Sequence, residues 1–147
     1  MVLFDIAEAT WKTRICNIDS LSLMQVFAVS FLSILFLQSG LDKVFDWKVN
    51  LAWLKSHFAN SILAKVVPIL LGIITFFEVA AGVFSTIGVV NIIVGNGDFV
   101  AFIGAALSAL ALIMLFFGQR IAKDYAGAGG LVPYFIFTLA TLYILVY

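Results

Sequence analysis

One carboxylate inside an apolar stretch is the residue of this chain with the clearest capacity for chemistry. Glu78 lies near the centre of the apolar run 66–94. A charge at mid-membrane costs roughly 2.5–3.5 kcal/mol on insertion scales, so this carboxylate needs a partner, a water-filled cavity or a proton. Its functional interpretation is a proton relay, or a group that hydrogen-bonds a quinone or another polar headgroup. Its structural interpretation is a carboxylate satisfied by a nearby polar side chain, for which the candidates are Gln38, Gln25, Thr75 and Lys43.

A second group of polar residues lies between two later apolar runs, in the segment GQRIAKDYAGAGG at 118–130. The segment is interpreted as a docking surface, an anion or lipid-headgroup site, or a solvated cap on the preceding helix. Arg120 and Asp124 are one helical turn apart and can pair, which contributes only a few tenths of a kcal/mol if exposed. The later glycines would let the chain turn back into the membrane. The candidate docking residues are Gln119, Arg120, Lys123, Asp124 and Tyr125.

Cysteine and histidine are too scarce for most redox or metal chemistry. Cys16 and His57 are the only residues of their types. They cannot form a dithiol pair, provide paired haem ligands, or complete a four-ligand metal site. We therefore expect no intrinsic cofactor and no catalysis by this chain alone, which leaves a quinone or a lipid as a candidate ligand. His57 is expected to be a polar residue at the membrane interface.

The composition identifies the surroundings in which these residues act. Apolar residues make up 64% of the 147 positions and charged residues 11%, against about 45–50% and about 25% in soluble domains. Equal numbers of basic and acidic residues, 8 of each, give no sign of a nucleic-acid partner. The excess apolar surface predicts an integral membrane protein.

Four apolar runs have about the length that crosses a bilayer as a helix. Continuous apolar runs exclude the alternating pattern of a membrane barrel. The fold class is therefore an all-α membrane protein, a bundle of four transmembrane helices in a single membrane domain that covers 1–147. The predicted spans are 21–40, 66–94, 99–118 and 131–147.

The connections between these spans differ in kind. A tight turn at 95–98 makes the second and third spans antiparallel neighbours. Residues 1–20 are expected to form an amphipathic segment, and a short interfacial amphipathic helix is expected between the first two spans. The count of Lys and Arg favours placing the two long connections in the cytoplasm. The apolar face of the interfacial helix consists of Trp47, Leu51, Leu54 and Phe58.

Small residues at helical spacing predict how the spans pack. Such rows let helix backbones approach closely, which is a main source of association in lipid. They predict a compact bundle, and a homo-oligomer or a complex with other membrane subunits in preference to an isolated monomer. The rows are Ala101, Ala105 and Ala109 beside Gly104 and Ser108, with Gly82 and Thr86, and Ala81 and Ser85, in the second span.

Two motifs resemble the DoxX family of small bacterial membrane proteins. A G-x-x-K pattern closes the first span at Gly40 and Lys43. An E-x-x-x-G pattern with a further glycine lies in the second span at Glu78, Gly82 and Gly88. The resemblance covers about 21–147. Many family members carry an arginine early in the first span, where this chain has Gln25.

The resemblance implies a protein of the bacterial inner membrane that is linked to respiratory or thiol redox systems. The leading hypothesis is a non-catalytic subunit or accessory factor of a quinone-linked complex, with membrane lipids and other subunits as partners. One alternative is a small transporter or proton-conducting module that uses Glu78. Another is an assembly or scaffold subunit that depends on the interfacial helix.

Overall fold

The computed structural model describes residues 19–147, so the predicted amphipathic segment at 1–20 lies almost entirely outside the described residues. The described part is helical, and four of its helices are long and apolar enough to cross a membrane. This confirms the all-α class and indicates a membrane protein. The helices are α2 (Ser20–Phe45), α3 (Trp47–His57), α4 (Val67–Val94), α5 (Phe99–Ile121) and α6 (Tyr125–Val146).

Local signals in the sequence explain where several of these helices begin and end. The Asp19 side chain accepts a hydrogen bond from the backbone N–H of Ser22 at 3.1 Å and caps α2. Gly95 ends α4 with φ at 79°, in the left-handed region that favours glycine. Gly97 also has a positive φ of 88°, so the predicted tight turn between α4 and α5 is present.

Three helices extend beyond the predicted spans, and α5 does so by three residues, to Ile121. α2 continues past residue 40 to Phe45, so Lys43 lies within the helix. α6 begins at Tyr125, so the glycines that were expected to form a loop lie inside its first turns. The side chain of Asp124 accepts a hydrogen bond from the N–H of Gly127 at 2.8 Å, which starts α6 early. Apolar surroundings also favour helix here, because a helix pairs its own backbone groups.

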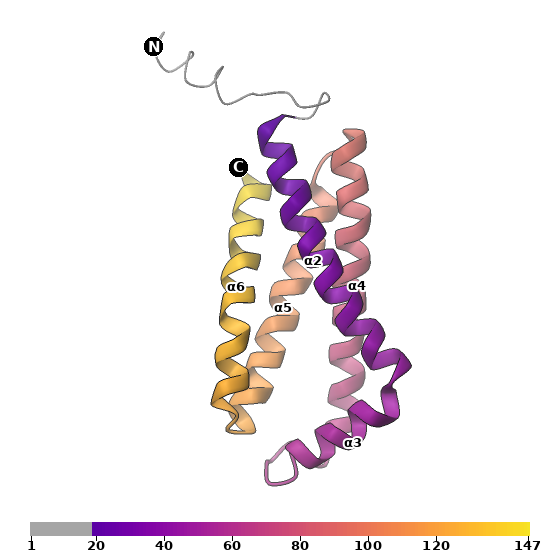
Figure 1. The fold of residues 1–147 in the computed structure, drawn as a ribbon, viewed down its shortest axis with the longest axis vertical. Coiled ribbons are helices and arrows are strands. Elements are labelled where there is room, and N and C mark those ends of the chain that lie inside the picture. The colour runs from indigo at the N-terminus through magenta and orange to yellow at the C-terminus, as the bar shows by residue number, and fades with distance from the viewer. Residues whose placement is uncertain (1–18) are drawn as a thin grey trace.

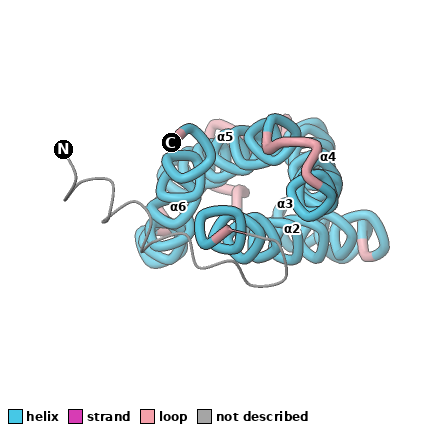
Figure 2. Tube along the Cα trace, turned by 90° about the horizontal axis from the view of Figure 1, so that it is seen from above, coloured by secondary structure: helices cyan, strands magenta, loops and turns pink. Residues whose placement is uncertain are grey.

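The long helices form a bundle in which α4 packs between α2 and α5, and α6 packs against α5 (Figures 1 and 2). The α4–α5 turn and the C-terminus lie at one end of the bundle (Figure 1). α3 and the α5–α6 turn lie at the other end, where α3 runs obliquely across it. The second end carries the Lys and Arg residues of the described chain, which are Lys43, Lys48, Lys55, Lys65, Arg120 and Lys123.

Small residues bring α4 and α5 into close contact, as their spacing predicted. A Cβ added at Gly104 would lie 2.6 Å from the backbone nitrogen of Ser85. One added at Gly88 would overlap the backbone of Ala101. Ala101 and Ala105 are fully buried. The two backbones therefore meet directly in the half of the bundle near the α4–α5 turn.

Candidate functional site

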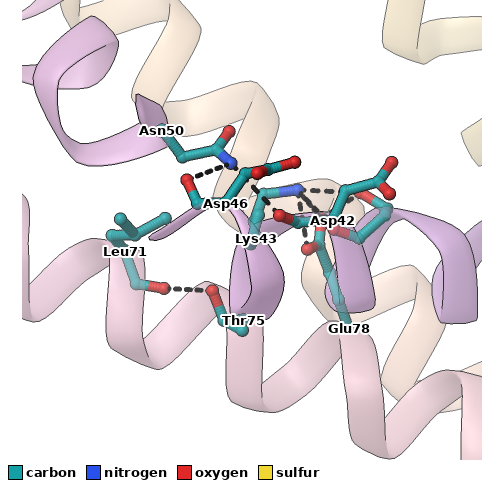
Figure 3. A network of polar contacts seen from close by, with 8 residues as sticks. Asp42, Lys43, Asp46, Asn50, Leu71, Thr75 and Glu78 are labelled. Carbon is teal, nitrogen blue, oxygen red and sulfur yellow. Dashed lines mark hydrogen bonds and ion pairs between the residues drawn. The ribbon is translucent and has the colours of Figure 1, made fainter. Parts of the chain in front are cut away.

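Glu78 is paired with Lys43 across the contact between α2 and α4 (Figure 3). The Nζ of Lys43 lies 2.8 Å from Oε2 of Glu78 and donates a hydrogen bond to Oε1 at 3.1 Å. Ser39 joins them, since its hydroxyl donates to Oε1 of Glu78 at 3.0 Å and accepts from Lys43 at 2.8 Å. We call Ser39, Lys43 and Glu78 the polar centre.

Lys43 directs its hydrogen bonds to other atoms of the polar centre. An ammonium has three donors, and Lys43 directs them to Oε1 of Glu78 and to the hydroxyl and carbonyl oxygens of Ser39. Glu78 is fully buried, whereas the Lys43 side chain is 18% exposed. Oε2 of Glu78 accepts no hydrogen bond from the described residues and has only its ion-pair contact with Lys43. Lys43 is therefore the partly exposed member of the pair, and Glu78 the buried one.

Glycines position this centre. A Cβ added at Gly40 would lie 2.7 Å from Cγ2 of Val79, and one at Gly82 would lie 2.7 Å from the backbone nitrogen of Leu37. These contacts hold α2 against α4 beside the ion pair. Four of the five residues that carry the family resemblance, Gly40, Lys43, Glu78 and Gly82, thus meet at one helix crossing. The fifth, Gly88, lies at the separate contact between α4 and α5.

Of the four partners considered for Glu78, the structure selects Lys43. Gln38 is exposed and makes no hydrogen bond within the described chain, so it does not belong to the polar centre. Thr75 donates instead to the carbonyl of Leu71 at 2.7 Å (Figure 3). Sequence reasoning missed Ser39, although its position one turn before Lys43 places both on one face of α2.

Gln25 has a separate role at the opposite end of the bundle. Its Nε2 donates to the backbone carbonyl of Ile144 at 2.8 Å and to Oδ2 of Asp98 at 3.3 Å. The carbonyl of Ile144 is one of the last four of α6, which have no partner within that helix. Gln25 therefore ties α2 to α6 and to the α4–α5 turn.

An asparagine fixes the bend between α2 and α3. The Nδ2 of Asn50 donates to the backbone carbonyl of Asp46 at 3.0 Å and to that of Asp42 at 3.3 Å (Figure 3). Asp42 lies in the last turn of α2 and Asp46 is its C-cap, and each carbonyl also accepts a backbone N–H, from Asp46 and from Asn50 respectively. This side chain thereby sets the start of α3 next to the polar centre.

The candidate docking residues divide between two helices and the turn that joins them. Gln119 and Arg120 end α5, and Tyr125 begins α6. Lys123 is exposed with φ at 60°. The possible ion pair between Arg120 and Asp124 is not present, because α5 ends at Ile121 and the two residues are not on one helix. The guanidinium carbon of Arg120 lies instead 4.7 Å from the ring centre of Tyr125.

His57 links α3 to this turn, a connection that sequence reasoning missed. Its Nε2 lies 3.0 Å from Oε1 of Gln119 and 3.6 Å from Oδ2 of Asp124. The imidazole also stacks on Trp53, with 4.7 Å between ring centres. We call His57, Gln119 and Asp124 the histidine link. The only histidine of the chain is therefore a tether between elements.

Comparisons with known proteins found no significant match to the chain among family models, curated proteins or solved structures. The polar centre and the histidine link are therefore interpreted from their own geometry. Within residues 19–147, no three His, Cys, Asp or Glu side chains gather as a possible metal site. The polar centre can hold two helices together and, through Lys43, can present a cation near a buried carboxylate.

Proposed function

We propose that this protein is a DoxX-like subunit or accessory factor of a quinone-linked redox complex in the bacterial inner membrane, and that it is not catalytic alone. The observation that carries the proposal is the convergence of Gly40, Lys43, Glu78 and Gly82 at one buried crossing. The two motifs are far apart in the sequence, and their contact at one crossing gives the residues of both motifs a shared structural role.

In this proposal, the polar centre fixes the surface that a partner subunit or a quinone recognises. α3 lies in the membrane interface, with Leu51 and Leu54 partly buried and Lys48 and Lys55 exposed. A quinone carbonyl could accept a hydrogen bond from Lys43 by replacing the ammonium's longest bond, the 3.2 Å contact with the carbonyl of Ser39.

The proposal is tested by gentle purification of the tagged protein from its native membrane, followed by native mass spectrometry and quinone analysis. We expect a stoichiometric redox protein or a retained quinone. We also expect the amount of either to fall in Glu78→Gln and to stay unchanged in the control Asp42→Asn, whose residue is exposed. A homo-oligomer that carries only ordinary phospholipid would overturn the accessory role.

A proton-conducting module is the second candidate, and one observation favours it. Glu78 is fully buried and the side chain of its partner Lys43 is 18% exposed, so the ion pair connects the interior of the bundle to its surface. A relay predicts proton flux in liposomes that Glu78→Gln abolishes and Asp42→Asn preserves. Equal flux in the wild type, in Glu78→Gln and in protein-free liposomes would exclude it.

A further inference from the structure

An apolar cavity lies between α4 and α5 in the half of the bundle nearest α3. Its volume is about 210 Å³. A cavity of about 150 Å³ lined by similar side chains is large enough to bind benzene, so this one can hold a longer apolar group. Its walls include Val67, Leu71 and Ile74 of α4, Met114 and Leu115 of α5, and Phe58 after α3.

The cavity reaches the outer surface of the bundle. Ile73 and Phe117 also line it, and their side chains are 43% and 62% exposed. α4 and α5 diverge toward α3 (Figure 1), because the small residues that hold them together lie only in their other halves. In a membrane, the opening therefore faces the hydrocarbon chains of lipids.

One side of the cavity is lined by a polar side chain. Gln119 lines the cavity, and its Oε1 is engaged by His57. Its Nε2 makes no hydrogen bond to any residue in 19–147, which leaves two donors for an external acceptor.

Three exposed cations flank the cavity lining along the chain. Lys55 follows Leu54, Lys65 lies between Leu63 and Val67, and Arg120 follows Gln119. These cations lie at the same end of the bundle as the cavity, and a cationic end is complementary to an anionic headgroup.

We propose that this cavity binds one acyl chain of an anionic phospholipid. The chain occupies the apolar space, its ester carbonyl accepts a hydrogen bond from Nε2 of Gln119, and its phosphate is attracted by Lys55, Lys65 and Arg120. A quinone has a neutral head and would gain nothing from these cations. The assignment is independent of the redox role proposed above.

The test uses the full chain in nanodiscs of equal phosphatidylglycerol and phosphatidylcholine, followed by native mass spectrometry after mild delipidation. We expect the wild type to retain phosphatidylglycerol at least fivefold over phosphatidylcholine. Gly118→Leu places a side chain toward Phe58, inside the cavity, and should lower the retained lipid at least tenfold. Gly129→Leu is the matched control, since a Cβ there meets nothing within 4 Å, and should bind as the wild type does.

A second variant separates the headgroup from the chain. Lys65→Gln combined with Arg120→Gln should retain lipid but lose the preference for phosphatidylglycerol, whereas Lys48→Gln should keep it. Equal retention of both lipids by the wild type would overturn the proposal, whatever the variants do. Equal retention by Gly118→Leu and Gly129→Leu would also overturn it, as would displacement of the phospholipid by added ubiquinone.

Discussion

The polar centre and the histidine link both join elements distant in the sequence, but they do so in opposite ways. Around Lys43 and Glu78, glycines bring two backbones together and leave the carboxylate fully buried. Around His57 and Asp124, the side chains are 21% and 29% exposed, and an apolar cavity lies beside Gln119. At the polar centre, the backbones of two helices are in direct contact. At the histidine link, side chains connect the elements beside a cavity.

This difference distinguishes a part of the bundle whose contacts are fixed from a part whose contacts can change. Removing one partner of a buried ion pair leaves an uncompensated charge, which costs several kcal/mol. A partly exposed hydrogen bond can exchange with water at little cost. The α2–α4 crossing is therefore a rigid part of the bundle, and the α3 end is where we expect a ligand or partner to enter with little loss of stability.

The largest expected effect comes from breaking the ion pair on its exposed side. Lys43→Met leaves the Glu78 carboxylate buried without its cation and should lower the free energy of unfolding by about 3–5 kcal/mol. Denaturation in mixed micelles measures this loss.

The matched control is the double variant Lys43→Met with Glu78→Leu, which removes both charges together. It should regain most of the lost stability, because replacing a whole buried pair by apolar residues is often neutral. If the double variant is as unstable as Lys43→Met, the pair is not the source of the rigidity.

A smaller effect is expected from a glycine at the close contact between α2 and α4. Gly82→Ala must push Leu37 away, and overpacking of this kind costs about 1–3 kcal/mol. Gly129→Ala, on the exposed side of α6, should instead be neutral or stabilising, since alanine favours helix. Equal effects of the two changes in a denaturation series would remove the contrast between tight and open regions.

The sequence predicted the architecture well because hydrophobic length and small-residue spacing are local properties. Four membrane-capable helices, the tight turn at 95–98 and the contact of Gly104 with Ser85 all follow from such patterns. The start of α6 was wrong because glycine-rich stretches suggest loops in water. Here a cap at Asp124 and apolar surroundings favour helix.

The candidate site was only partly predictable, because side-chain pairing depends on how helices cross. The cost of a buried charge indicated a partner, a cavity or a proton for Glu78, and it left Gln38, Gln25, Thr75 and Lys43 as candidate partners. Gln38 and Ser39 are adjacent in α2, but Gln38 is exposed and Ser39 contacts Glu78. Which of the two side chains reaches Glu78 depends on how α2 crosses α4. Predicting the histidine link would have required knowing where α3 lies relative to α5 and α6. A single histidine provides no periodic pattern from which that position could be inferred.

The histidine link should contribute less to stability than the glycine contact at Gly82. His57→Phe keeps an aromatic ring for Trp53 but removes the hydrogen bond to Gln119, which should cost about 0.5–1.5 kcal/mol at most. Because Trp53 stacks on residue 57, its fluorescence reports whether the end of α3 has moved. A loss as large as that of Lys43→Met would show that the α3 end is as rigid as the polar centre.

The smallest effect is expected at a buried hydroxyl inside the tight region. The Oγ of Ser85 is fully buried between α4 and α5 and has no hydrogen-bond partner among the described residues. A buried polar group without a partner is destabilising, so Ser85→Ala should be neutral or raise the unfolding free energy by up to about 1 kcal/mol. Ser33→Ala is the control, because its hydroxyl pairs with that of Thr86 at 2.6 Å and its loss should destabilise. If Ser85→Ala destabilises the protein as much as Ser33→Ala does, the hydroxyl of Ser85 has a partner, and close packing at α4–α5 includes a polar contact as the α2–α4 crossing does.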